Sequence, residues 1–395
     1  MKVAIVGAGN VGATLAYTLL ARDVATRISL IDVNQEKALG EVLDLAHGAS
    51  YLDNAEIRAE GYDGVADADI VVLTAGRGRK PGESRLDLAR GNAAITEEIL
   101  AGIIPHYRGA VVVVVSNPMD VLTYLAVKRL PAPPSRIIGS GTALDSSRFR
   151  YLLGREFDID PRNIHAYVIG EHGDSSVPVW SMASLGQIPV NLYAPPGRMP
   201  LDDQARQRIH QSVVTAGKEV IQRKGATFYA VALSVARIIE AVLDDEKSVL
   251  TVSTYIEQLG PIADVCLSLP AVVGRDGIRE VLPIVLDDEA RRRIHQAVVT
   301  AGKEVIQRKG ATFYAVSLSV ARIIEAILHN EKSVLTVSTY IEQFGPIADV
   351  CLSLPAVVGR EGVREVLPIV LDEDEQDKLA ASAAALKAII AQLGI

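Results

Sequence analysis

The first half of the chain alternates short, apolar, β-branched runs with longer stretches in which apolar residues recur at helical spacing. The apolar runs predict strands over residues 3–7, 28–32, 70–74 and 111–116. The stretches between them predict helices over about 11–21, 36–47 and 86–104. Strands that alternate with helices indicate right-handed βαβ units. We therefore expect a doubly wound α/β fold, with a parallel sheet covered by helices on both faces.

After residue 142 the pattern changes, and this change sets the predicted domain boundary. A predicted helix over 143–154 is followed by a predicted strand over 165–169. The chain ends in an amphipathic helix over 372–395. We therefore predict one domain over 1–142 and a second, mixed α+β domain over 143–395.

The second domain contains one 85-residue segment twice. The first copy spans 202–286 and the second copy 287–371, and they agree at 75 of 85 aligned positions. Each copy has two stretches of helical spacing and then a hairpin, predicted over 265–273 and 278–284 in the first copy. Removing one copy leaves 395 − 85 = 310 residues. One copy must complete the second domain, and the sequence leaves open which one does so.

Composition excludes several classes of protein. Hydrophobic residues make up 49% of the chain and charged residues 22%, which is ordinary for a globular protein. The net charge of −8 gives no general attraction to nucleic acid or anionic membranes, and the longest aliphatic run, 110–115, is too short to span a bilayer. The first residues show no signal-peptide pattern. We therefore expect a cytoplasmic protein without nucleic-acid or membrane partners.

The two cysteines and seven histidines indicate neither a disulfide framework nor a metal site. Cys266 and Cys351 are one position copied twice, so a reducing compartment fits the chain. The histidines show no ligand spacing with cysteine or carboxylate residues, and we expect no metal.

A glycine-rich turn, GAGNVG at residues 7–12, lies where the first predicted strand meets the first predicted helix. Its glycines permit a tight turn and a close approach of the backbone to a pyrophosphate, which the helix N-terminus also attracts. Asp32 ends the second predicted strand, where its carboxylate can bind a ribose and repel a 2′-phosphate. We therefore predict an NAD site. Its expected residues are Gly7, Gly9, Asn10, Val11, Gly12, Asp32, Thr74, Ala75, Gly76 and Asn117.

Three further segments carry residues suited to proton transfer and anion binding. His172 lies in GEHGD directly after a predicted strand, where it can reach a substrate. Asp145 and Arg148 lie three residues apart on one predicted helix, so both can address one cavity. A basic loop over 74–85, punctuated by glycine and proline, follows a predicted strand. Taken singly, each segment has a plainer interpretation: a surface histidine, an intrahelical ion pair and a solvated loop.

Together these motifs closely resemble the NAD-dependent L-lactate/malate dehydrogenases. The matching segments, in the family's order, are GAGNVG, Asp32, KPGESRLDL at 80–88, SNPMD at 116–120, LDSSRFR at 144–150 and GEHGD at 170–174. The resemblance covers the whole chain except one surplus copy. It implies a Rossmann-type domain, an α+β substrate domain and a homo-oligomer, either a dimer or a tetramer.

The resemblance also implies catalytic roles. His172 would take the hydroxyl proton as a 2-hydroxy acid is oxidised and return it in the reduction. Asp145 would orient the imidazole and stabilise its protonated form. Arg85 would polarise the ketone oxygen, and its loop, about 77–90, would close over the substrate.

Substrate-binding roles follow from the same resemblance. Arg148 would bind the substrate carboxylate through two parallel hydrogen bonds, which lysine could not reproduce. Asn117 would lie between nicotinamide and substrate. Thr227, or its counterpart Thr312 in the second copy, would line the pocket wall.

The choice of 2-hydroxy acid depends on Arg79. In this family the side chain before Lys80-Pro81-Gly82 faces the substituent on C2 of the substrate, and it is typically glutamine in lactate enzymes and arginine in malate enzymes. An arginine would pair with the second carboxylate of oxaloacetate. Glu83, Leu86 and the threonine of GATFY look more like the lactate branch. We therefore predict that malate and oxaloacetate are favoured, with L-lactate and pyruvate as the alternative.

Three interpretations of the duplication remain open. The chain is an active dehydrogenase with an appended partial domain, a non-catalytic NAD-binding scaffold whose packing the duplication spoils, or an artificial chain. The catalytic residues are intact and the proton-transfer residues all precede residue 202; their being intact favours the first interpretation over the second. The apolar faces of the surplus copy invite aggregation or exchange between subunits.

Overall fold

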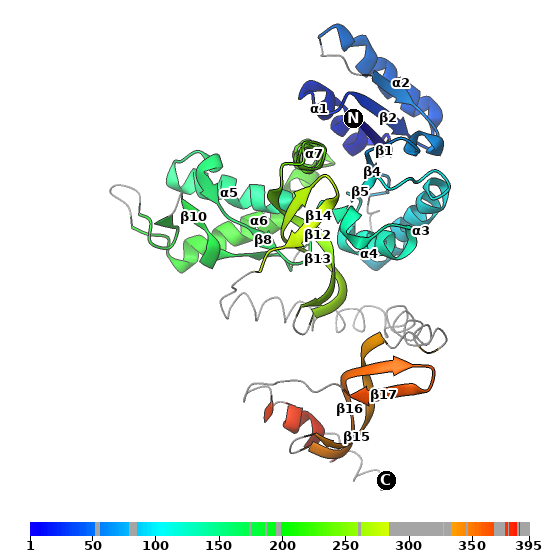
Figure 1. Cartoon of the computed structure of the whole chain (residues 1–395). Coiled ribbons are helices and arrows are strands. Elements are labelled where there is room, and N and C mark those ends of the chain that lie inside the picture. The colour runs from blue at the N-terminus through cyan, green and yellow to red at the C-terminus, as the bar shows by residue number, and fades with distance from the viewer. Residues whose placement is uncertain are drawn as a thin grey trace. The chain divides into compact units, whose positions relative to one another are not determined.

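The chain divides into two compact units, Met1–Ala297 and Val298–Ile395, as Figure 1 shows. The computed structural model describes 1–51, 56–78, 85–173, 175–185, 188–194, 199–259, 262–283, 327, 333–344, 347–366, 376–377, 379–384 and 387. Some predictions therefore lie outside the described residues. They include nearly all of the helices of the second copy and most of the helix expected over 372–395, of which the described residues are helical.

A nine-stranded sheet runs through the first unit. Six of its strands are parallel, in the order β3-β2-β1-β4-β5-β6. They are β1 (Lys2–Val6), β2 (Arg27–Ile31), β3 (Glu56–Ala59), β4 (Ile70–Leu73), β5 (Val111–Val114) and β6 (Ile137–Gly139). The antiparallel strands β12 (Ser248–Leu259), β13 (Ile262–Gly274) and β14 (Gly277–Val281) extend the sheet beyond β6.

Helices cover both faces of the parallel strands. One face packs against α1 (Asn10–Ala21), α2 (Gln35–His47) and α7 (Tyr229–Leu243). The other packs against α3 (Arg85–Ile103) and α4 (Met119–Arg129). All four residues of β5 are buried valines, since a strand covered on both faces needs apolar side chains on both. The doubly wound α/β fold is thus confirmed.

The rest of the first unit is mixed α+β. It contains α5 (Ala143–Phe157), α6 (Asp203–Lys224), β7 (Ile164–His165), β8 (Val168–Ile169), β9 (Val177–Pro178), β10 (Ser184–Leu185) and β11 (Ile188–Pro189). Short 3₁₀ helices lie at Ala49–Tyr51, Tyr62–Val65, Pro134–Arg136, Pro161–Asn163 and Trp180–Met182. A small core between α5 and α6 includes Phe149, Leu153, Ile209 and Val213.

Four of the six parallel strands were predicted, and their boundaries agree with the structure to within two residues. β3 and β6 were not predicted, because β3 is an edge strand without fully buried positions and β6 is only three residues long. The strand predicted over 165–169 is split into β7 and β8 because each half pairs with a different strand, β10 and β9 respectively. The strand β12 was not predicted. Its Thr251 and Ser253 are buried although polar, so the apolar alternation that marks a strand is lost there.

The hairpin of the repeat forms twice. In the second unit β15 (Ser333–Phe344), β16 (Ile347–Gly359) and β17 (Gly362–Val366) make a separate three-stranded sheet. Its register reproduces that of β12–β14, including an irregularity at the equivalent valine pair. The surroundings of the copies differ, because β12 also pairs with β6. Accordingly Cys266 is buried and its counterpart Cys351 is exposed.

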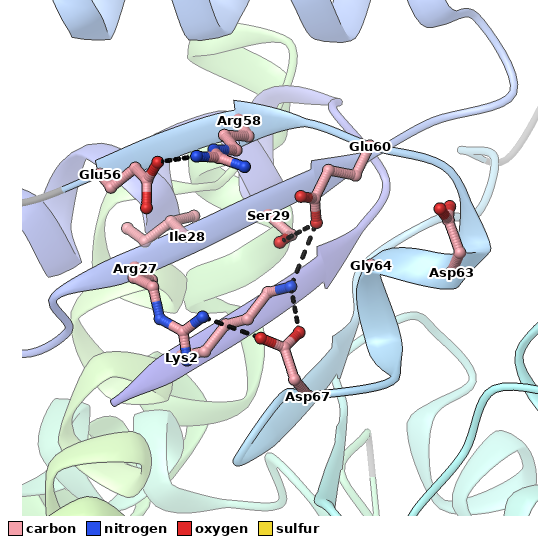
Figure 2. A pocket seen from close by; sticks show the side chains of 10 residues that line it. All are labelled: Lys2, Arg27, Ile28, Ser29, Glu56, Arg58, Glu60, Asp63, Gly64 and Asp67. Atoms are coloured by element: carbon pink, nitrogen blue, oxygen red, sulfur yellow. Dashed lines mark hydrogen bonds and ion pairs between the residues drawn. The ribbon is translucent and has the colours of Figure 1, made fainter.

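A charged hollow of about 190 Å³ lies over β1, β2 and β3 (Figure 2). Lys2 is buried there, and its Nζ atom lies 2.5 Å from Asp67 and 3.2 Å from Glu60. Arg27 also pairs with Asp67, at 2.8 Å, and the Ser29 hydroxyl donates to Glu60. These charges satisfy one another, so we interpret the hollow as a structural ion network rather than a ligand site.

Candidate active site

The glycine-rich turn joins β1 to α1 with very little space. Gly7 has φ +115°, a conformation that favours glycine. A Cβ atom on Gly12 would lie 1.8 Å from the Gly7 carbonyl oxygen, so this contact also requires glycine. Gly9 caps α1, and a Cβ atom there would meet nothing within 4 Å. The turn is therefore closed on its packed side and open at the N-terminus of α1, as a dinucleotide pyrophosphate requires.

Asp32 follows β2 and is held beside this turn. Its carboxylate accepts the Ala8 N–H at 2.7 Å and the Asn34 N–H at 2.9 Å. These two bonds fix the carboxylate at the carboxyl end of the sheet, where it can accept hydrogen bonds from ribose hydroxyls. The residues therefore fit NAD.

The ends of β4 and β5 meet the same turn. The Thr74 hydroxyl donates to the Gly7 carbonyl at 3.0 Å, and the Ala75 N–H donates to the carbonyl of Val6. Ser116 donates to the Ala75 carbonyl at 2.6 Å, just before Asn117. The structure thus brings together most residues predicted to bind the cofactor, which lie at the carboxyl ends of adjacent parallel strands.

A buried carboxylate joins the candidate proton carrier to the candidate substrate arginine. Asp145, in the first turn of α5, is 5% exposed. One of its oxygens lies 2.6 Å from Nδ1 of His172, and the other lies 2.7 Å from a terminal nitrogen of Arg148. The two side chains of the i, i+3 pair and the histidine therefore form one connected group.

The two acid–base partners alter each other's pKa. Burial alone would lower the pKa of His172, but the hydrogen bond and the charge of Asp145 outweigh it and raise that pKa. Burial alone would raise the pKa of Asp145, yet its bonds to His172 and Arg148 hold it below the usual range. The arrangement therefore favours an ionised carboxylate beside a readily protonated imidazole.

Two residues that sequence reasoning missed also belong to this site. The backbone N–H of His172 donates to Asp120 at 2.8 Å, and the Ser253 hydroxyl donates to the other Asp120 oxygen at 2.6 Å. Burial raises the pKa of Asp120 to about 6, against both hydrogen bonds. Asp120 ends the SNPMD motif, which could have drawn attention to it. Ser253 carries no such signal, because it lies in a segment whose sequence does not alternate as a strand does.

Hydrogen bonds of buried hydroxyl groups connect α5 to β8 and to the hairpin of the first copy. The Ser146 hydroxyl accepts the Val168 N–H at 2.8 Å and lies 2.8 Å from the Thr251 hydroxyl. The Thr142 hydroxyl donates to the Val168 carbonyl, and its N–H donates to Ser268. Two strands of the first copy thus hold the helix that carries Asp145 and Arg148.

The remaining predicted residues are described in part. Arg79 and Thr312 lie outside the described residues, and Arg85 begins α3 without a described side chain. Thr227 lies between α6 and α7 and is partly buried. Asn117 is exposed and is followed by a cis peptide bond to Pro118.

Over the described ranges the chain has neither a membrane-spanning helix nor a cluster of metal-ligating side chains. There, no helix combines the length and apolar character needed to cross a membrane. In the same part of the chain, no three histidine, cysteine, aspartate or glutamate side chains are grouped so that they could hold a metal ion.

Comparison with known proteins points to one family. A family model described as lactate/malate dehydrogenase, NAD binding domain, matches residues 1–139. The model described as lactate/malate dehydrogenase, alpha/beta C-terminal domain, matches twice, over 142–300 and 284–394. The two matches to the second model agree with the duplication.

Individual relatives cover most of the chain. An L-lactate dehydrogenase of Acetivibrio thermocellus is 44% identical over 306 residues, which are 78% of this chain and 96% of that protein. One of Thermoanaerobacter pseudethanolicus is 45% identical over 309 residues, which are 78% and 98%. The crystal structure of a minor L-lactate dehydrogenase from Enterococcus mundtii in a ligand-bound form matches with a TM-score of 0.73 at 38% identity, covering 78% of this chain and 98% of that one. These spans are close to the 310 residues that remain without one copy.

Proposed function

The chain belongs to the lactate/malate dehydrogenase family and uses NAD, and from this premise we propose that it is an L-lactate dehydrogenase. The reaction is the reversible transfer of a hydride between the C2 carbon of a 2-hydroxy acid and the cofactor. The observation that carries this proposal is the Asp145 carboxylate, which holds both His172 and Arg148. This carboxylate places a proton carrier, His172, beside a cation for the substrate carboxylate, Arg148.

The malate preference that Arg79 suggests is not supported by the comparisons. The named relatives are L-lactate dehydrogenases, so lactate and pyruvate, the alternative in the sequence analysis, are the better supported pair. Arg79 remains a reason to test oxaloacetate as a second substrate, because an arginine that faced the C2 substituent would pair with the extra carboxylate of oxaloacetate.

His172 moves the proton in the proposed mechanism. With Nδ1–H donated to Asp145, the neutral imidazole has its lone pair on Nε2, which accepts the hydroxyl proton of lactate. NAD, when bound, supplies the acceptor for the hydride that leaves C2. In the reverse direction Nε2–H returns the proton to the ketone oxygen, and Asp145 stabilises the imidazolium before transfer.

Arginine side chains bind and polarise the substrate. Arg148 uses one terminal nitrogen for Asp145, and its other N–H groups are proposed to bind the substrate carboxylate. Arg85 is proposed to polarise the ketone oxygen from the closing loop. Asn117 and Thr227 are proposed to line the pocket.

The first copy is proposed to complete the substrate domain. Its Ser253 contacts Asp120, its Ser268 contacts Thr142, and its β12 pairs with β6. On this basis the pocket wall is lined by Thr227 rather than Thr312. The second copy is then an appended partial domain on an active enzyme.

Oxidation of NADH tests the function with one preparation of the full chain. We expect kcat/KM to be higher with pyruvate than with oxaloacetate, and we expect His172→Gln to abolish turnover while NADH still binds. A higher kcat/KM with oxaloacetate would instead identify the chain as a malate dehydrogenase. If the full chain binds NADH and turns over neither acid, but a chain lacking 287–371 does, the chain is a scaffold that its second copy has inactivated.

A further inference from the structure

A second carboxylate contacts His172 from a different part of the fold. Asp120 is the second residue of α4, and its Oδ2 atom accepts the backbone N–H of His172 at 2.8 Å. Its Oδ1 atom accepts the hydroxyl of Ser253 from β12 at 2.6 Å. One side chain therefore links the dinucleotide-binding half, the histidine turn and the first copy of the repeat.

We propose that Asp120 is a positioning residue that acts through His172, fixing the backbone of its turn and adding a second negative charge beside the imidazole. The proposal rests on the proposed function, in which His172 carries the proton. The charge of Asp120 favours the imidazolium form, which is the form that donates a proton to the ketone.

The groups that face the two side chains support this assignment. Around His172, burial disfavours the imidazolium; Asp145 and then Asp120 favour it, and Arg148 opposes it. Around Asp120, burial raises the pKa to about 6, while the bonds from Ser253 and His172 and the imidazolium charge lower it, and Glu171 raises it. Above that pH the carboxylate of Asp120 is ionised, and its charge adds to that of Asp145 near the same imidazole.

Replacement of the Asp120 carboxylate by an amide tests the effect of its charge independently of its hydrogen bonds. In Asp120→Asn the amide oxygen can still accept the His172 N–H, and the amide nitrogen can donate to the Ser253 oxygen once that hydroxyl rotates. Both links between elements then persist while the charge is lost. A merely structural role for Asp120 predicts little change in the titration of His172.

The matched control is Asp264→Asn, which removes one negative charge from the hairpin that carries Ser253. Asp264 contacts Lys128, Tyr124 and Tyr255 rather than His172. The full-length protein is used in every case, because both copies are present in the chain as it exists.

The primary measurement is the rate at which diethyl pyrocarbonate modifies His172, followed by peptide mass spectrometry between pH 5 and 8.5. The reagent attacks neutral imidazole, and the side chain of His172 is 25% exposed. We expect the midpoint in Asp120→Asn to lie lower by roughly half a pH unit or more, since opposite charges within a few ångströms favour the charged form. The alkaline limb of kcat/KM for pyruvate should move in the same direction, and Asp264→Asn should move neither.

The results of these measurements distinguish failure of the role proposed for Asp120 from failure of the proposed function. An unmoved His172 midpoint in Asp120→Asn overturns the proposal even if activity falls. If that variant does not fold, Ser253→Ala replaces it, because loss of the hydroxyl raises the pKa of Asp120 and should produce a smaller shift in the same direction; no shift overturns the proposal. If the wild-type chain turns over no 2-oxo acid, the proposed function fails, while the modification rates still decide the role of Asp120.

Discussion

Replacement of Asp145 by asparagine should reveal how much of the proton transfer depends on one buried carboxylate. The carboxylate makes two bonds to cationic partners, at 2.6 Å to His172 and 2.7 Å to Arg148, and is 5% exposed. An asparagine can accept from only one partner and presents N–H groups to the other. The variant therefore loses one charge-assisted bond and the charge that stabilises the imidazolium.

The size of the effect follows from these contacts. A hydrogen bond to a charged group contributes about 1.5–3 kcal/mol, and the Asp145 charge acts on both partners. A loss of about 3 kcal/mol in the transition state lowers kcat/KM for pyruvate roughly 100-fold at neutral pH. Because Asp145 raises the pKa of His172, the variant should lose the protonated form at lower pH. In pyruvate reduction the alkaline limb therefore moves to lower pH, and in lactate oxidation the acidic limb does so.

Steady-state NADH oxidation between pH 5 and 8.5 measures this effect. Asp158→Asn is the matched control, because Asp158 is an exposed cap at the other end of α5 with φ 57°, a conformation that asparagine also adopts. NADH affinity, followed by fluorescence, should be unchanged in both variants. A loss below threefold in Asp145→Asn, with both limbs at the wild-type position, would refute the role given to this carboxylate.

Two further predictions concern the repeat. A thiol reagent should modify Cys351 quickly and leave Cys266 unmodified in the native chain. The reason is that Cys266 is 1% exposed and burial raises the pKa of its thiol. Equal rates of modification would contradict the different surroundings of the two hairpins. A chain that keeps only the second copy should unfold at a lower denaturant concentration than one that keeps only the first, and Ser317→Ala should recover part of the difference. Equal midpoints for the two shortened chains would show that the copies are interchangeable.

The sequence predicts four of the six parallel strands and the cofactor turn, because these depend on local patterns. Buried parallel strands are apolar on both faces, and the requirement for glycine at positions 7 and 12 is set by backbone geometry within one turn. The contact of His172 with Asp145 could be expected only from the family resemblance, since 27 residues separate them. Asp120 and Ser253 were not predicted as site residues, because their hydrogen bond joins polar side chains 133 residues apart that give no periodic signal.

Connectivity alone does not decide which copy completes the sheet. An additional 85 residues in a connection raise its closure entropy only logarithmically, so the second copy could follow the first half at small cost. The residues that bond to α5 and Asp120 do not distinguish the two copies either, because Thr251, Ser253 and Ser268 recur unchanged 85 positions later. One difference that places a polar group in the core lies on α7, where Ala232 is fully buried among apolar side chains and its counterpart is Ser317. A hydroxyl buried at that position costs about 1–3 kcal/mol unless it finds a partner, which favours the first copy in the sheet.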